Sequence, residues 1–208
     1  MELPERIIEH YSHHLREHGH PPQSVFRFCK DLEITESEFF RTFGSLEAVE
    51  SALWQKMIER VIESVSNGAE WESFGSRQRT LAFLFAFLES SLELRSLLLV
   101  RKEVFRPFCR SHAIAGFAAA HKRFMTDVID KGRETGEVAE RGVLTGFYPE
   151  VFLTHLLAVI EFHLADTSAG FERTDAFVEK TVNLAFDVIR TQAVDSAFDL
   201  VRFLIPRH

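Results

Sequence analysis

Apolar residues recur along most of the chain at the three- and four-residue spacing of an amphipathic helix, whereas the alternating pattern of a β-strand is scarce. Gly and Pro residues are few, and they lie mainly between the periodic segments. The pattern therefore predicts an all-α protein. Its helices are expected approximately over residues 4–18, 24–31, 35–42, 45–66, 76–92, 94–105, 111–132, 145–166, 172–191 and 194–204.

Three of the expected helices begin with a residue whose side chain can cap a helix. Ser24, Thr35 and Ser45 each precede a periodic segment, and each can accept a hydrogen bond from the first turn. Glu38 lies three residues after Thr35, which is the spacing of a capping box. The first three helices are short and closely spaced, and the later ones are long. This contrast predicts a small N-terminal module, residues 1–54, joined to a helical body, residues 55–208.

The expected helix over 145–166 is apolar nearly all round, and such a helix must be covered on every side. We expect its own core to cover one side and a second subunit to cover the other. Together with the helix over 172–191, it would form a four-helix bundle across a two-fold axis. A single large monomeric core is the alternative. The residues predicted at the subunit interface are Phe152, Leu156, Ile160, Phe177, Leu184 and Ile189.

Composition and charge narrow the possible functions. The chain has 208 residues, of which 46% are hydrophobic and 26% charged, as in ordinary globular proteins. A net charge of −7 excludes a strongly basic nucleic-acid binder, although a local basic patch is compatible with it. The longest apolar run, 81–88, is too short to cross a bilayer, and the first residues carry no signal-peptide pattern, so a cytoplasmic location is expected.

The segment 24–54 has the spacing of a helix-turn-helix, because two short helices flank a three-residue turn. Ser24-Val25, Cys29, Ile34-Thr35, Phe39-Phe40 and the segment 43–49 follow a characteristic order, preceded by Ile7, Ile8, Tyr11, Leu15 and Gly19. In this order of residues the chain resembles the TetR family of bacterial repressors over about its first quarter. The resemblance implies a homodimer that binds operator DNA and releases it when a small molecule enters the body.

The resemblance also implies which residues face DNA. The second helix of the motif would enter the major groove, where its N-terminal side chains meet base edges. Arg and Lys side chains of the module would contact phosphates. The candidate DNA-binding residues are Arg27, Lys30, Thr35, Glu36, Ser37, Glu38, Arg41 and Thr42.

Several positions of the module depart from the family pattern. Glu33 stands where the turn usually has Gly, Phe40 where Tyr is usual, and Leu46 where a phosphate-binding Lys is usual. Up to residue 56 the chain has six Lys and Arg against ten Asp and Glu, a net charge of −4. Because affinity for DNA depends strongly on phosphate neutralisation, operator DNA is a partner in doubt. A module kept for folding after DNA binding was lost is the alternative.

The chain is unusually rich in phenylalanine, with 21 Phe against two Tyr and two Trp, and many of these Phe residues lie in the body. Some of these rings are expected to line an apolar pocket for a small-molecule or lipid effector, since such pockets combine apolar walls with a few polar groups. The alternative is that the rings simply fill the core. The candidate pocket residues are Phe83, Phe87, Phe105, Phe117, His121, Phe124, Phe152 and His155.

Two other functions are alternatives to a DNA-binding regulator. Lipid-binding accessory proteins of ubiquinone biosynthesis resemble the TetR fold and carry an extra amphipathic helix. A helix of this kind is expected here over 194–204. A lipid or isoprenoid carrier is therefore the second hypothesis. The third hypothesis is a metal-dependent enzyme, but the sequence contains none of the common catalytic motifs. His10, His14 and His18 lie on one helical face, but a solvated polar face explains them, so we expect no metal, no cofactor and no catalysis.

Overall fold

The computed structural model of the chain describes residues 2–108, 111–140 and 142–190. Within these ranges regular structure is entirely helical, which confirms the all-α prediction. The α-helices are α1 (Leu3–His18), α2 (Val25–Asp31), α3 (Glu36–Thr42), α4 (Leu46–Ser66), α5 (Ser76–Glu93), α6 (Arg95–Val100), α7 (Ala115–Thr135), α8 (Tyr148–Ala165) and α9 (Glu172–Arg190). The short 3₁₀ helices are η1 (Trp71–Ser73), η2 (Lys102–Phe105), η3 (His112–Ile114), η4 (Gly142–Phe147) and η5 (Ala169–Phe171).

Three expected boundaries differ from the structure. The helix expected over 94–105 is two elements, α6 and η2, because the backbone leaves helical geometry at Arg101. The helix expected from 145 begins as η4 and becomes α8 only at Tyr148, where Pro149 occupies a first-turn position that needs no N–H. The helix expected over 194–204 lies outside the described residues.

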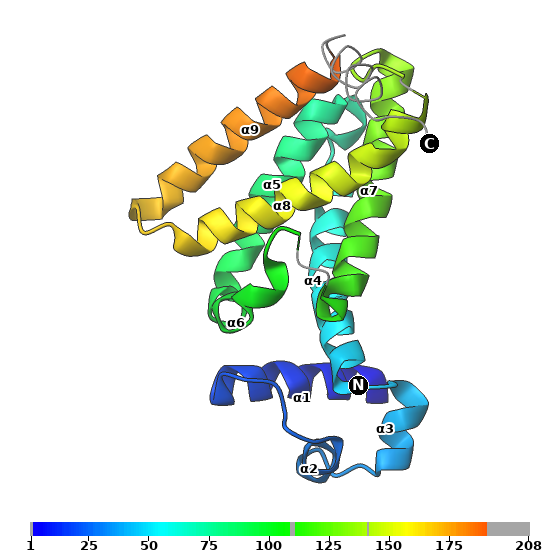
Figure 1. Cartoon of the computed structure of the whole chain (residues 1–208), viewed down its shortest axis with the longest axis vertical. Coiled ribbons are helices and arrows are strands. Elements are labelled where there is room, and N and C mark those ends of the chain that lie inside the picture. Colours follow the sequence, from blue (N-terminus) through cyan, green and yellow to red (C-terminus); the bar gives the residue numbers. More distant parts are fainter. Residues whose placement is uncertain (1, 109–110, 141, 191–208) are drawn as a thin grey trace, which may run out of the picture.

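The N-terminal module is built by α1, α2, α3 and the start of α4. All three predicted caps are present: Ser24 Oγ accepts from the backbone N of Arg27 at 3.3 Å, and Ser45 Oγ accepts from that of Ala48 at 3.1 Å. Thr35 forms the predicted capping box with Glu38. Figure 1 shows the module at one end of the molecule, with α4 continuing from it into the body. The predicted boundary at residue 54 therefore falls inside one continuous helix.

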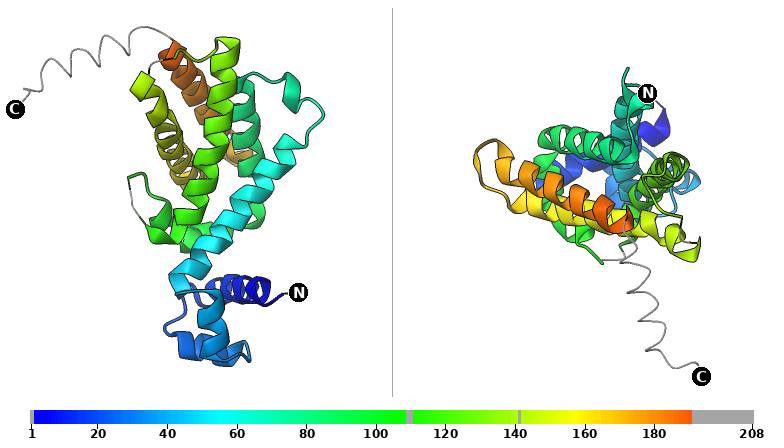
Figure 2. Two further views of the ribbon diagram at one scale, coloured as in Figure 1. Left: turned by 90° about the vertical axis from the view of Figure 1, so that its right-hand side faces the viewer. Right: turned by 90° about the horizontal axis from the view of Figure 1, so that it is seen from above.

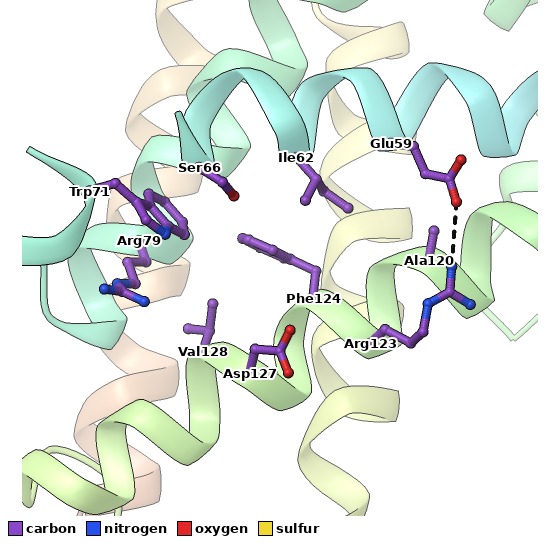
Figure 3. A pocket seen from close by; sticks show the side chains of 10 residues that line it. All are labelled: Glu59, Ile62, Ser66, Trp71, Arg79, Ala120, Arg123, Phe124, Asp127 and Val128. Atoms are coloured by element: carbon purple, nitrogen blue, oxygen red, sulfur yellow. Dashed lines mark hydrogen bonds and ion pairs between the residues drawn. The ribbon is translucent and has the colours of Figure 1, made fainter. Parts of the chain in front are cut away.

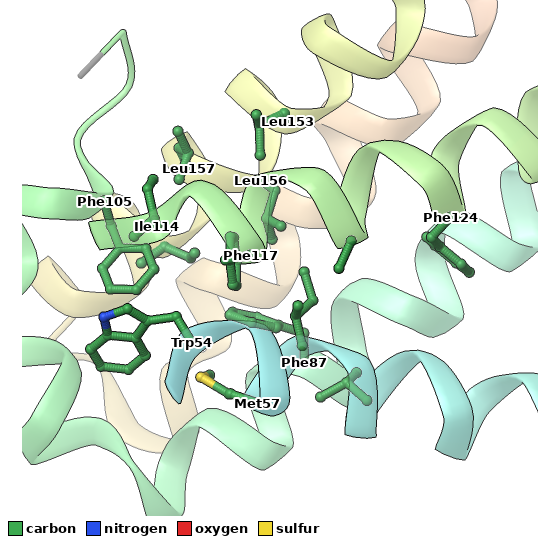
Figure 4. Close-up of a cluster of buried hydrophobic side chains, with 14 of the residues drawn as sticks. Trp54, Met57, Phe87, Phe105, Ile114, Phe117, Phe124, Leu153, Leu156 and Leu157 are labelled. Carbon is green, nitrogen blue, oxygen red and sulfur yellow. The ribbon is translucent and has the colours of Figure 1, made fainter. Parts of the chain in front are cut away.

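The body packs α4, α5, α7, α8 and α9 around a core that is largely aromatic. Helices α4 and α7 lie against each other along much of their length, and α8 and α9 run side by side on the outside (Figures 1 and 2). Figure 4 shows part of this core, in which Phe105 meets Trp54 edge-on with ring centroids 4.9 Å apart. Phe117 lies 5.5 Å from Phe105 and 6.0 Å from Phe87. Rings from distant segments thus interlock and fix the helices relative to one another.

A close approach between α5 and α7 depends on a glycine. A Cβ atom at Gly132 would lie 2.6 Å from Ser76 Oγ and 2.6 Å from a methyl group of Val138. The Ser76 hydroxyl uses this proximity to donate a hydrogen bond of 2.6 Å to the carbonyl of Val128. The pair of helices is therefore joined by a polar contact that a larger residue at position 132 would disrupt.

Candidate DNA-binding module and effector cavity

The turn between α2 and α3 has the geometry of a helix-turn-helix. The backbone N of Ile34 donates to the carbonyl of Cys29 at 3.0 Å, and Glu33 adopts a left-handed conformation with φ of 56°. A residue with a side chain pays about 1–2 kcal/mol in this conformation, which glycine avoids. The position at which the family pattern usually has Gly is therefore one that favours Gly in this chain as well.

Three of the candidate DNA contacts are used within the motif itself. Thr35 donates to the Glu38 carboxylate from its backbone N at 2.8 Å and from its hydroxyl at 2.7 Å. These hydrogen bonds lower the pKa of Glu38 and keep it ionised. The hydroxyl of Thr42 donates to the carbonyl of Glu38 at 2.9 Å. The polar atoms of these side chains therefore stabilise α3, a role that the sequence indicated for Thr35 and Glu38 but not for Thr42.

The other five candidates, Arg27, Lys30, Glu36, Ser37 and Arg41, are exposed. In the described part of the chain, their side chains make no hydrogen bond and no ion pair. One acidic residue counted against DNA binding is neutralised from outside the module, because Glu50 pairs with Arg101 of the body. Glu5 pairs with Lys56 at 3.1 Å, but that lysine is already in the count, so only the Glu50 pair changes the net charge, by one unit. The net charge of −4 therefore overstates how much negative charge the module presents to DNA.

A buried hydrogen-bonded network joins the module to the body. Glu50 on α4 is almost fully buried and receives two hydrogen bonds from Arg101, at 2.7 and 3.0 Å. Tyr11 of α1 donates to the same carboxylate at 2.9 Å, and Trp54 donates at 3.2 Å. Burial and the Glu50 charge raise the pKa of Tyr11 well above its ordinary value. Sequence reasoning missed this network because Arg101 lies 51 residues from Glu50.

The predicted pocket residues mostly form solid core instead. Six are fully or nearly fully buried against one another or against neighbouring rings, and these are Phe83, Phe87, Phe105, Phe117, His121 and Phe152. His155 of α8 lies close to α9 and contacts the Thr181 hydroxyl through Nε2 at 2.7 Å. Phe124 lines a cavity between α4, η1, α5 and α7. Phenylalanine enrichment indicated burial correctly but carried no information on where the packing leaves space.

His121 is an ionisable group deep in this core. Its Nδ1 atom has no hydrogen-bond partner in the described ranges, and its ring contacts Phe83 with centroids 5.5 Å apart. Burial, with a further contribution from nearby His155, lowers the pKa of His121 to about 3. His121 is therefore neutral at physiological pH.

A cavity of about 290 Å³ opens between α4, η1, α5 and α7, and we call it the Trp71 cavity (Figure 3). Its apolar wall includes Trp71 and Phe124, whose rings stack with centroids 5.9 Å apart. The guanidinium of Arg79 lies 4.8 Å above the Trp71 ring. Sequence reasoning did not find this site, because its lining residues come from four separate elements. The lining residues are Glu59, Ile62, Ser66, Trp71, Arg79, Ala120, Arg123, Phe124, Asp127 and Val128.

The interface prediction needs a correction. Phe152, Leu156, Ile160 and Ile189 are buried within the subunit itself, so they are not available to a partner. Phe177 is half-buried and stacks on Phe162 at 4.5 Å, whereas Leu184 is 63% exposed. An all-round apolar helix gives no sequence signal of which side faces inward, which is why the prediction selected the inner face of α8.

A different set of residues forms an exposed apolar face on α8 and α9. Phe147 and Val151 are both exposed and lie one helical turn apart. One turn further, His155 contacts Thr181 of α9, and Leu184 follows Thr181 by one turn on that helix. We call Phe147, Val151 and Leu184 the α8–α9 apolar face.

Two other kinds of site are absent from the described ranges. No helix there is long and apolar enough to span a membrane. No three His, Cys, Asp or Glu side chains there are placed to hold a metal ion, although His14 and His18 stack with ring centroids 4.1 Å apart.

Comparison with known proteins identifies the fold family. Residues 79–204 match the family model described as tetracyclin repressor-like, C-terminal domain. No curated protein matches the chain in sequence.

Solved structures show the same fold at low sequence identity. A TetR-family regulatory protein from Rhodococcus RHA1 has a TM-score of 0.54 at 13% identity, covering 91% of this chain and 97% of its own. NemR from E. coli in its reduced form has a TM-score of 0.52 at 17% identity, with coverage of 86% and 96%. A transcriptional regulator from Cytophaga hutchinsonii has a TM-score of 0.55 at 16% identity, with coverage of 90% and 98%. Since the family model spans more than half of the sequence, the chain belongs to the TetR family.

Proposed function

We propose that the protein is a transcriptional regulator that binds operator DNA as a homodimer and responds to a small molecule bound in its body. The observation that carries the proposal is the helix-turn-helix at the free end of the molecule. Its turn is formed, α3 is capped, and Arg27, Lys30 and Arg41 have no ion-pair partner in the described ranges. Unpaired cations beside an exposed helix suit phosphate contacts around a groove.

The acidic residues of α3 suit a protein that binds a specific DNA sequence better than one that binds any DNA. Glu36 and Ser37 stand at the start of α3, where side chains of a recognition helix meet base edges. A carboxylate can accept from the amino group of cytosine, and the exposed ring of Phe40 can contact a thymine methyl group. We therefore expect the module to prefer certain sequences and to bind other DNA weakly.

The α8–α9 apolar face supports the homodimer. Large apolar side chains that are exposed together on neighbouring helices mark an interaction surface. The same face in a second copy would pair with it across a two-fold axis as a four-helix bundle. Two copies joined in this way would hold two modules at a fixed separation, as a two-part operator requires.

The Glu50 network supports communication between the two parts. Arg101 lies between α6 and η2 of the body, while Tyr11 belongs to α1 of the module, and both bind the same buried carboxylate. A shift of α6 on effector binding would therefore move or break a contact that positions α1. Such a network gives the body a direct physical means of changing module orientation.

The experiment is selection of operator sequences from a random duplex library by the full-length protein, followed by fluorescence anisotropy with the enriched sequence. We expect saturable binding, weakened by Arg41→Gln and by Lys30→Gln, and a changed base preference at one position for Glu36→Gln. Lys131→Gln, on α7 in the body, is the control and should bind like the original. Failure to enrich any sequence would contradict the proposal.

The lipid-carrier hypothesis is not favoured by these observations. The family match and the regulators among the similar structures point to regulation rather than transport. In addition, most residues predicted to line an apolar lipid pocket are instead closely packed against other rings.

A further inference from the structure

The Trp71 cavity contains a positive charge that the protein itself leaves poorly paired. The Arg79 side chain is only 9% exposed, and its nearest carboxylate, Glu72, lies 3.5 Å away on a side chain that is 89% exposed. An exposed partner at this distance contributes little. Burying a charge without a close partner is costly, so the site favours an anion from outside.

The guanidinium is held in place with donors to spare. Its Nε donates to the carbonyl of Phe74 at 2.9 Å, and its plane lies over the Trp71 ring. In the described part of the chain Nη1 makes no hydrogen bond, and Arg79 lines the cavity. A fixed guanidinium with a free edge matches the geometry of a carboxylate, which can accept two parallel hydrogen bonds.

The rest of the cavity specifies the body of the ligand. Trp71, Phe124, Ile62 and Val128 present apolar surface, as Figure 3 shows. A volume of about 290 Å³ is at the lower limit of small-molecule pockets, roughly 300–1,000 Å³, which suits one or two rings rather than a lipid chain.

The charges at the other end of the cavity set the orientation. Figure 3 shows Arg79 beside Trp71, whereas Arg123 pairs with Glu59 at 3.4 Å across the opposite end. Asp127 lies between them and would repel an anion placed near it. A ligand with one negative charge must therefore direct that charge to Arg79.

We infer that the Trp71 cavity binds a small molecule with a flat apolar body and a single carboxylate, with the carboxylate on Arg79 and the body against Trp71 and Phe124. This deepens the proposed function by naming the chemical class of the effector, and it depends on that proposal only for the consequence at DNA. Binding itself requires neither DNA nor a dimer.

The test is calorimetric titration of the full-length protein, without DNA, using trans-cinnamate and naphthoate and the neutral carboxamide of each. We expect each carboxylate to bind about tenfold or more tightly than its carboxamide, since a hydrogen-bonded charge pair is lost with the amide. Arg79→Gln should weaken carboxylate binding about 10- to 100-fold and remove the preference. Arg79→Lys should keep part of it.

Two variants in the same cavity serve as matched controls. Arg123→Gln removes an exposed cation that Glu59 already neutralises, so the preference for carboxylate should remain. Asp127→Asn removes the repelling charge and should strengthen carboxylate binding. Should Arg79→Gln fail to fold, Ser66→Trp tests the location independently, because Ser66 is an exposed cavity residue and a large ring there would fill the space.

Three results would overturn the inference: no carboxylate binding at millimolar concentration, equal affinity for carboxylate and carboxamide, or unchanged binding in both Arg79→Gln and Ser66→Trp. A separate measurement of operator binding distinguishes the two proposals. Carboxylate binding without any DNA binding would contradict the regulator alone, and operator binding without carboxylate binding would contradict the effector class alone.

Discussion

Glu33 and His121 show how single residues in this chain carry an energetic cost. Glu33 holds the turn of the helix-turn-helix in a conformation that disfavours any side chain. His121 places an ionisable ring in the core with an unsatisfied nitrogen. Each cost predicts a variant that is more stable than the original under defined conditions.

Glu33→Gly should raise the free energy of unfolding by about 0.5–1 kcal/mol, because relief of the left-handed strain exceeds the entropy cost of glycine. Chemical denaturation measures the change. Glu33→Gln removes the same charge but keeps the strain, so it should gain much less. Equal stabilisation by both variants would show that charge, and not backbone conformation, is responsible.

Acid should destabilise the protein through His121. The pKa of His121 is about 3 in the folded state, and an unfolded histidine has a pKa of about 6.5. Below about pH 6.5 the unfolded state gains a proton that the folded state does not bind, so stability falls with pH from there to about pH 3. On acidification, the melting temperature of His121→Phe should therefore fall less than that of the original protein. His112→Gln, at an exposed site, should behave like the original. An unchanged pH dependence in His121→Phe would contradict this reading.

Asp166 directly follows α8, in the connection to α9. We expect its carboxylate to cause a second loss of stability in acid. Its carboxylate accepts hydrogen bonds from Ser168 and from Thr174, at 2.7–2.9 Å, and these lower its pKa. The stabilisation is therefore present above the ordinary aspartate pKa of about 3.9 and is lost as pH falls below it. Asp166→Asn should be less stable at neutral pH, and its difference from the original should shrink below about pH 4 in urea unfolding. A difference independent of pH would refute the assignment.

At the scale of helices, local signals were predictable and long-range ones were not. Ser24, Thr35 and Ser45 cap as expected because a cap depends only on residues three positions apart. The inward side of α8 was not predictable, because the helix has apolar residues on every side. The spacing of its apolar residues therefore does not indicate which side faces the core. The Trp71 cavity and the Glu50 network combine residues from distant segments, and no spacing in the sequence reports such a meeting.

The link between α1, α4 and α6 predicts a double-variant result. Glu50→Gln should lower the free energy of unfolding by about 3 kcal/mol, because it leaves the largely buried Arg101 without its buried counter-charge and paired only with the exposed Glu103. Adding Arg101→Met should recover part of that loss, since the uncompensated charge is then removed. Chemical denaturation of both single variants and of the double variant gives the coupling energy. Simple additivity would show that the two side chains do not act as a pair.

The whole molecule is a long helical body with the N-terminal module at one end (Figure 2). Two of its outer helices carry the α8–α9 apolar face. In the proposed function, a two-part operator requires two modules, which the α8–α9 apolar face would bring together in a dimer. Each module alone carries few free cations, and the proposed dimer would double their number on one DNA site.

Leu184→Glu should convert the proposed dimer to a monomer, because it places a charge in the α8–α9 apolar face. Sedimentation velocity at micromolar concentration measures the change. Leu92→Glu is the matched control, since Leu92 is an exposed leucine on α5, outside the α8–α9 apolar face. A chain that sediments as a monomer before any substitution would contradict the proposed assembly.

The most direct measurement of the central claim is the salt dependence of binding to the DNA upstream of the protein's own gene. Arg27, Lys30 and Arg41 on two protomers amount to six cations, which predicts that the logarithm of the association constant falls linearly with that of salt concentration, with a slope of roughly −5. Anisotropy titrations over a series of salt concentrations supply the slope. Absence of saturable binding at low salt, or an affinity that salt does not change, would contradict a dimeric DNA-binding regulator.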